Sequence, residues 1–273
     1  MTNNELFNLE KKVIVITGAT GVLAGMIGRY LAKQGATIVL LARKKELGMQ
    51  MVEEIEEAGG KAYFFESDVL NESMLRQNLV DILTTCGSID ILINAAGGNM
   101  PGANVMPEQS FADLDLDAFK QVVDLNFYGC FLPTQIFSTA MIRNQKGIII
   151  NFTSATVERP MTRVVGYSAA KAAVANFTQW LSVEFAQKYG NQMRVNNISP
   201  GFFLTEQNRK LLTQPDGTYT ERGNKIINNT PMQRLGNPND LCGAIHWLCS
   251  DASAFVTGQT IVVDGGFDAY AGV

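Results

Sequence analysis

The fold is decided by the sequence KVIVITGATGVLAG, which runs from Lys12 to Gly25. Its first five residues, Lys12–Ile16, form an apolar run typical of a buried strand. A glycine-rich turn follows, and helical periodicity begins near residue 23. Glycines allow a tight turn in which backbone N–H groups and the N-terminus of the next helix face an anion. The stretch therefore predicts a site for the phosphates of a dinucleotide, with a purely structural turn as the alternative. The contacts are expected from Gly18, Thr20, Gly21 and Leu23.

The rest of the chain repeats this alternation of strand and helix. Apolar runs rich in Val and Ile, without polar alternation, are typical of strands covered on both faces. The expected strands are Lys12–Ile16, Thr37–Leu41, Ala62–Phe65, Ile89–Ile93, Gly147–Phe152, Arg194–Ile198 and Gln259–Val263. Amphipathic helical segments lie near residues 23–34, 45–58, 72–85, 115–142, 166–188 and 238–250. The pattern predicts one α/β domain over residues 1–273, a doubly wound Rossmann-type parallel sheet with helices on both faces.

One segment does not fit a minimal arrangement of sheet and helices. Residues 202–234, from Phe202 to Arg234, are polar and rich in turn residues, including Gln214-Pro215-Asp216-Gly217. A long connection inside a compact domain is usually functional or disordered. Because this one follows the sixth expected strand, we expect it to form a lid over the substrate.

Composition restricts the classes of function. The 273 residues carry a net charge of −4, so there is no basic surplus for binding nucleic acid or an anionic membrane. The apolar stretches are too short to cross a bilayer and the N-terminus lacks a signal-peptide pattern, which predicts a cytoplasmic location. The four cysteines show no paired spacing and the single histidine is His246, so we expect buried thiols and no metal site.

The residues after the second expected strand bear on the choice of nucleotide. An acidic residue there would bind a ribose 2′-hydroxyl and repel a 2′-phosphate. The chain instead carries Arg43 and Lys44, with no acid before Glu46. Two cations can pair with a 2′-phosphate, so the sequence favours NADP(H), with NAD(H) possible. The alternative is a solvated basic start to a helix.

Three residues form the expected catalytic set. Tyr167 and Lys171 lie in the sequence YSAAK, and Ser154 follows the apolar run Gly147–Phe152. A spacing of four places the phenol and the ammonium group on one helix face. An ammonium group nearby lowers the pKa of a phenol, which can then exchange a proton with a carbonyl or alcohol oxygen. The Ser154 hydroxyl can hydrogen-bond the same oxygen, so the set predicts an oxidoreductase.

Together these motifs resemble the short-chain dehydrogenase/reductase family along essentially the whole chain. The matching pieces are Thr17-Gly18, Asp68-Val69, Asn94-Ala95-Ala96-Gly97, Asn126, Ser154, Tyr167, Lys171, Pro200-Gly201, Thr205 and Asp264-Gly265-Gly266. The resemblance implies a sheet of about seven strands, a nicotinamide cofactor and a homodimer or homotetramer. The chain departs from the family's T-G-x-x-x-G-x-G loop at Val22 and Ala24, and Ala95 replaces the second Asn of N-N-A-G, which leaves the loop geometry open.

The resemblance also implies roles for the matching residues. Asp68 and Val69 would hold the adenine end, and Asn94 would support the floor of the cofactor site. Asn126 would anchor a water linked to Lys171, which would also bind the nicotinamide ribose. The remaining cofactor contacts implied are Ala95, Gly97, Tyr167, Pro200, Gly201 and Thr205.

A finer resemblance is to the family's D-mannonate oxidoreductases, which interconvert D-fructuronate and D-mannonate; gluconate dehydrogenases are similar in many of the same places. The stretches that carry it are Leu132-Pro133-Thr134-Gln135, residues 176–181, residues 200–209 and the ending 264–273. A sugar acid needs a cation for its carboxylate, and Arg163 or Arg209 could supply one. Asn99 and Gln207 are expected to bind hydroxyls. The alternatives are another polyol dehydrogenase, a 3-oxoacyl-type ketone reductase and a nucleotide-sensing protein without catalysis.

Overall fold

A parallel sheet of seven strands forms the centre of the computed structural model, which describes residues 3–205 and 208–272. The strand order is β3-β2-β1-β4-β5-β6-β7. The strands are β1 (Val13–Thr17), β2 (Thr37–Ala42), β3 (Lys61–Glu66), β4 (Ile91–Asn94), β5 (Gly147–Phe152), β6 (Met193–Pro200) and β7 (Thr260–Val263). The chain reverses its direction of growth between β1 and β4, which is the position where open α/β sheets bind ligands. This confirms the expected fold class.

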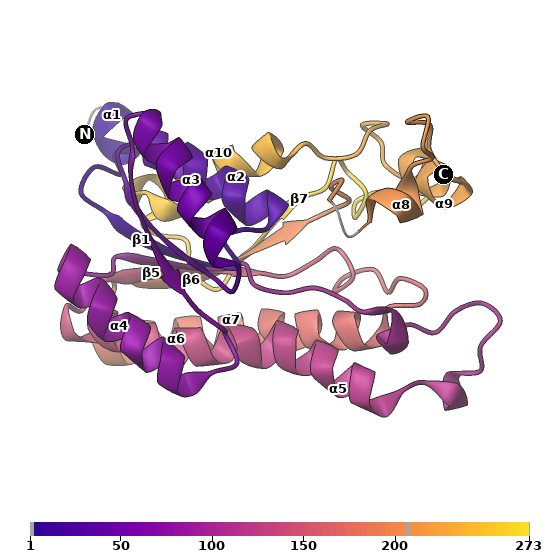
Figure 1. The fold of residues 1–273 in the computed structure, drawn as a ribbon, viewed down its shortest axis with the longest axis horizontal. Coiled ribbons are helices and arrows are strands. Elements are labelled where there is room, and N and C mark those ends of the chain that lie inside the picture. Colours follow the sequence, from indigo (N-terminus) through magenta and orange to yellow (C-terminus); the bar gives the residue numbers. More distant parts are fainter. Residues whose placement is uncertain (1–2, 206–207, 273) are drawn as a thin grey trace.

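Helices cover both faces of the sheet (Figure 1). The helices α2 (Val22–Lys33), α3 (Lys45–Glu57) and α10 (Cys242–Cys249) lie on one side. The helices α4 (Glu72–Cys86), α5 (Leu116–Val123), α6 (Gly129–Arg143) and α7 (Val165–Tyr189) lie on the other side. A short N-terminal helix, α1 (Asn3–Leu6), precedes the sheet. Each strand-to-helix connection therefore emerges at the carboxyl edge of the sheet.

The alternation of side chains along the strands divides the core into two layers. In β1, Ile14 and Ile16 join the cluster under α2 and α10, whereas Val13 and Val15 join the cluster under α4, α6 and α7. All four are nearly or fully buried. Strands with two buried faces need apolar residues at successive positions, which explains the continuous runs in the sequence.

The long helical pattern near residues 115–142 is not one helix. The structure has α5, then a π-helical turn at Asp124–Tyr128, and then α6. Such a turn inserts one residue into the hydrogen-bond ladder and is frequent at functional sites. The predicted helical segment is confirmed, but hydrophobic periodicity does not reveal the single inserted residue.

The segment 202–234 contains more structure than its polar composition suggests. It includes α8 (Arg209–Leu212) and α9 (Glu221–Asn228), which lie beyond the ends of β6 and β7 and close to the C-terminus (Figure 1). Leu212, Ile226 and Ile227 are buried and give these helices a small packed centre. Among the described residues, no helix is long and apolar enough to cross a membrane.

Candidate active site

The glycine-rich turn between β1 and α2 is built for close backbone approach. Gly18 has φ of +63°, and a Cβ there would lie 2.7 Å from Ala96 Cα, so only glycine fits. Gly21 is the N-cap of α2, and no side chain caps this end of the helix among the described residues. Val22, which departs from the family pattern, is 40% exposed. The first N–H groups of α2 are therefore open to an anion, as a dinucleotide pyrophosphate requires.

The expected catalytic residues meet at the carboxyl edge of the sheet. Ser154 follows β5, and Tyr167 and Lys171 lie one turn apart in the first turns of α7. All three line a cavity of about 330 Å³. Lys171 is 4% exposed, and its Nζ donates a hydrogen bond to Phe152 O at 2.8 Å. The same Nζ lies 5.6 Å from the centroid of the Tyr167 ring. The spacing read from the sequence thus places phenol, ammonium and hydroxyl in one enclosure.

Burial governs the titration of this group. Burial raises the pKa of the Tyr167 phenol, and the hydrogen bond with Ser154 offsets part of that rise. Burial lowers the pKa of Lys171 to about 8. Both shifts favour the neutral forms, because a low-dielectric site disfavours charge. The protein alone therefore does not show the lowered phenol pKa that the Tyr–Lys spacing suggested.

Asn126 is held inside the π-helical turn behind the catalytic set. Its Nδ2 donates to Gly98 O at 2.6 Å and to Val122 O at 2.8 Å, and its Oδ1 accepts from Gly98 N at 3.2 Å. The inserted residue of the turn leaves the Val122 carbonyl available to this side chain. Asn126 thereby fixes the loop that carries Gly97 beside Lys171.

A row of polar side chains crosses the sheet beneath the site. Asn94, Asn151 and Asn197 occupy matching register positions on β4, β5 and β6. Asn94 Nδ2 donates to Asn151 Oδ1 at 2.8 Å, and Thr178 of α7 accepts from Asn151 and donates to Asn197 Oδ1 at 2.7 Å. Sequence reasoning found only Asn94; the missed signals were Asn151 near the end of the apolar strand β5 and Asn197 within β6.

The cavity brings together many of the residues expected from the sequence. Besides the catalytic set, the expected residues that line it are Leu23, Ala95, Gly97, Asn99, Pro200, Gly201 and Thr205. Asn94 and Asn126 lie behind this lining, where they orient the strands and the loop. Asn99 is exposed and donates to Asn104 Oδ1 at 2.8 Å, so it lies at the rim.

The two arginines expected to bind a carboxylate do not line this cavity. Arg163 lies beside a different hollow, with Val105 and Phe111, and Arg209 is exposed on α8. Gln207 lies outside the described residues. Arg222 of α9 lines the cavity instead, and sequence reasoning missed it. Its Thr220 N-cap was a signal for the helix that carries Arg222, but not for the direction of the arginine side chain.

The residues expected to bind the adenosine part of the nucleotide follow β2 and β3. Arg43 and Lys44 follow β2 and are exposed at the start of α3. Asp68 and Val69 follow β3, where Val69 is buried and Asp68 Oδ1 accepts from Leu70 N at 3.0 Å. The adjacent Ser67 hydroxyl is buried without a hydrogen-bond partner among the described residues. Exposed cations and a buried hydroxyl without a partner can both take polar groups of a dinucleotide.

No cysteine or histidine of the described residues lines the cavity of the catalytic set. No group of three or more His, Cys, Asp or Glu side chains there could hold a metal ion. The four cysteines are unpaired thiols, three of them buried. His246 Nε2 donates a hydrogen bond to Phe7 O at 2.7 Å, and its Nδ1 forms one with Tyr30 Oη at 3.1 Å, which ties the N-terminal segment to α10.

Comparison with known proteins gives a family for this fold and site. Residues 18–268 match the family profile described as enoyl-(acyl carrier protein) reductase. An uncharacterised oxidoreductase of Bacillus subtilis, UxuB, is 46% identical over 97% of this chain and 98% of its own length. A Haemophilus influenzae protein, provisionally named a D-mannonate oxidoreductase and solved with bound NAD, is 42% identical, with a TM-score of 0.91 over 97% of this chain and 98% of that one.

A more distant solved structure is also similar over its whole length. The gluconate 5-dehydrogenase of Burkholderia cenocepacia, in complex with NADP and tartrate, is 29% identical, with a TM-score of 0.87 over 99% of this chain and 100% of that one. The fold, the nucleotide loop, the Ser154–Tyr167–Lys171 set and these matches lead to one conclusion. The chain belongs to the short-chain dehydrogenase/reductase family and is an NAD(P)-dependent oxidoreductase acting on alcohol and ketone groups.

Proposed function

We propose that this enzyme interconverts the ketone and alcohol forms of a sugar acid, and that its substrates are D-fructuronate and D-mannonate. The observation that carries the proposal is the 330 Å³ cavity in which Ser154, Tyr167 and Lys171 meet polar groups at the rim and an arginine from the lid. The similarity to a protein named for D-mannonate, and to a gluconate 5-dehydrogenase, supports the same substrate class.

The chain's own residues supply the proton chemistry. A bound nicotinamide would supply or accept the hydride at the carbon that carries the oxygen. In ketone reduction, Tyr167 donates its phenol proton to the substrate oxygen, while the Ser154 hydroxyl holds that oxygen in place. In alcohol oxidation, the phenolate takes the hydroxyl proton. Lys171 stabilises the phenolate when protonated, and Asn126 keeps the adjoining loop in position.

We assign NADP(H) as the favoured nucleotide and retain NAD(H) as the alternative. The support is the exposed pair Arg43 and Lys44, which has no carboxylate partner among the described residues and lies where the ribose of the nucleotide would end. The remaining cofactor contacts of the proposed site are those predicted from the sequence, with Asn99 and Gln207 for the substrate hydroxyls. We also propose that residues 202–234 form a lid over the substrate. The enzyme would be a homodimer or homotetramer located in the cytoplasm.

Reduction of a more apolar ketone is the second candidate. Phe202, Leu211 and Leu212 line the cavity beside the polar groups, and a 3-oxoacyl-type substrate would use such a wall. The intact catalytic set argues against a protein that only senses nucleotide, since binding alone requires no buried Tyr–Lys pair.

A substrate panel tests the proposal directly. We expect the highest kcat/KM for D-fructuronate reduction and D-mannonate oxidation, followed spectrophotometrically with both nucleotides, against D-gluconate and a 3-oxoacyl thioester. Turnover of the thioester without turnover of any sugar acid would establish the second candidate in place of the first.

A further inference from the structure

Arg222 is the basic residue of the lid that lines the cavity of the catalytic set. It lies in the first turn of α9, next to the N-cap Thr220, whose Oγ1 accepts from Gly223 N at 3.1 Å. A Cβ on Gly223 would lie 2.3 Å from Leu212 O, so α9 packs closely against α8. These contacts fix the backbone of Arg222, and the position of its side chain follows from the fold of the lid.

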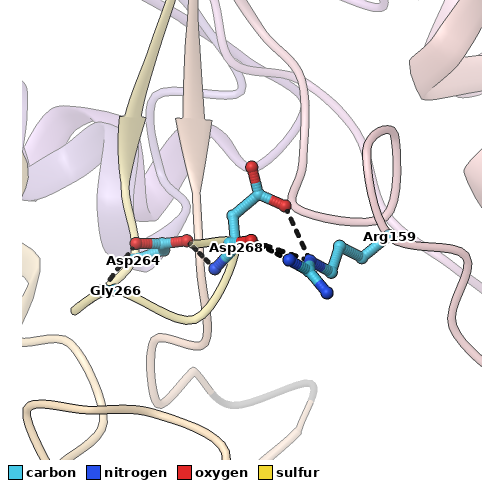
Figure 2. A network of polar contacts seen from close by, with 4 residues as sticks. All are labelled: Arg159, Asp264, Gly266 and Asp268. Atoms are coloured by element: carbon cyan, nitrogen blue, oxygen red, sulfur yellow. Dashed lines mark hydrogen bonds and ion pairs between the residues drawn. The ribbon is translucent and has the colours of Figure 1, made fainter. Parts of the chain in front are cut away.

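The charge of Arg222 has no counter-ion among the described residues. Two other basic groups nearby are paired: Lys225 lies 2.6 Å from Glu221 Oε1, and Arg159 contacts Asp268 (Figure 2). Arg159 Nε donates to Asp268 O at 2.8 Å, and the Asp264 carboxylate accepts from the backbone N–H groups of Gly266 and Asp268. That network neutralises the charge of Arg159 and anchors the C-terminal segment, which leaves Arg222, within the described part of the chain, as the unpaired arginine that lines the catalytic cavity.

The surroundings of Arg222 destabilise its charge when no anion is paired with it. The residue is only partly exposed, and burial lowers the pKa of its guanidinium, with the neighbouring cation Arg163 lowering it further. A partly desolvated guanidinium beside a second cation is stabilised when an anion pairs with it.

Arg222 also lies at the junction of two hollows. It lines the catalytic cavity and a second hollow of about 400 Å³ with Arg159 and Tyr270, and Phe202 and Met161 line both. An anion bound by Arg222 can therefore belong to a molecule whose reacting carbon lies at Tyr167. A carboxylate suits the site because guanidinium binds it through two parallel hydrogen bonds.

We propose that Arg222 binds the substrate carboxylate and so selects sugar acids over neutral sugars. The inference rests on the proposed function and names the residue that determines its specificity. Because α9 belongs to the lid, the pairing also links recognition of the acid to the position of α9 over the catalytic set.

The test compares an acid with its neutral analogue. In the nucleotide-loaded enzyme, Arg222→Met should lower kcat/KM for D-mannonate by about 10- to 100-fold, the scale of a lost charge-assisted hydrogen bond. The same variant should leave kcat/KM for D-mannonamide and the affinity for NADP(H) unchanged, and Arg222→Lys should recover part of the loss. Arg163→Met and Arg209→Met are the matched controls, expected to behave as the parent.

The outcomes separate this inference from the proposed function. If the parent oxidises D-mannonate and Arg222→Met does so equally well while keeping the parent's melting temperature, the inference is wrong and the function stands. Equal loss on acid and amide, or a loss of nucleotide affinity, assigns Arg222 to another role and also overturns the inference. If the parent turns over no sugar acid, the proposed function fails, and the inference fails with it.

Discussion

The amide group of Asn126 and the ammonium group of Lys171 lie on the same side of Gly97. A Cβ added to Gly97 would be 2.7 Å from Asn126 Oδ1 and 3.3 Å from Lys171 Nζ. The backbone there approaches both groups more closely than any side chain would allow. The loop after β4 therefore packs directly against both groups, and its backbone conformation constrains their positions.

Gly97→Ala should damage catalysis without unfolding the protein. The added methyl must displace Asn126 or Lys171, and a displacement of about 1 Å in a catalytic constellation costs on the order of 100-fold in rate. Steady-state kcat for the preferred substrate measures the effect. Gly243→Ala is the control, because a Cβ at Gly243 meets no atom within 4 Å. A Gly97→Ala enzyme as active as Gly243→Ala would show that the loop has no such role.

The rate of alcohol oxidation should rise with pH. Burial raises the pKa of Tyr167, so the phenol is protonated at neutral pH in the protein alone. Oxidation needs the phenolate, and its fraction increases about tenfold per pH unit below the pKa. Ketone reduction needs the phenol and should stay level over the same range. Measuring kcat/KM in both directions from pH 6 to 9 tests this, and an oxidation rate independent of pH would contradict it.

Arg43 and Lys44 should set the preference between nucleotides. Replacing both by Met removes the cations that would face a 2′-phosphate, and each lost charge-assisted contact costs about 1.5–3 kcal/mol at most. The Kd for NADP(H) should rise and the Kd for NAD(H) should hardly change, as measured by fluorescence titration. Lys45→Met, at the first residue of α3, is the control. A parent that prefers NAD(H), or an equal loss for both nucleotides, would refute the assignment.

Local signals in the sequence were enough to predict the frame of the site. The Gly18 turn and the Tyr167–Lys171 spacing depend on neighbours along the chain, and the structure places both as expected. Arg222 could not be selected over Arg209 in this way, because the choice depends on how α9 packs against α8. The π-helical turn and the polar row likewise depend on contacts between distant strands and helices.

The pKa of Tyr167 likewise could not be predicted from local sequence signals. The spacing predicted that Lys171 would lower it, yet burial of both groups has the larger effect in the protein alone. Burial depends on the helices that cover the site, including the small cluster of Ala103, Ala118 and Val122 against which Tyr167 packs. A sequence motif identifies the reacting groups, whereas the pKa values of those groups depend on the tertiary structure around them.

The most direct test of the account is the effect of Tyr167→Phe. This change removes the phenol oxygen and keeps the ring, so packing and nucleotide affinity should persist. We expect kcat for D-fructuronate reduction to fall by about two orders of magnitude or more, the usual scale for general acid catalysis. Tyr63→Phe, on β3, should match the parent. If Tyr167→Phe reduces D-fructuronate at close to the parent rate, the assignment of the reaction to Ser154, Tyr167 and Lys171 is wrong.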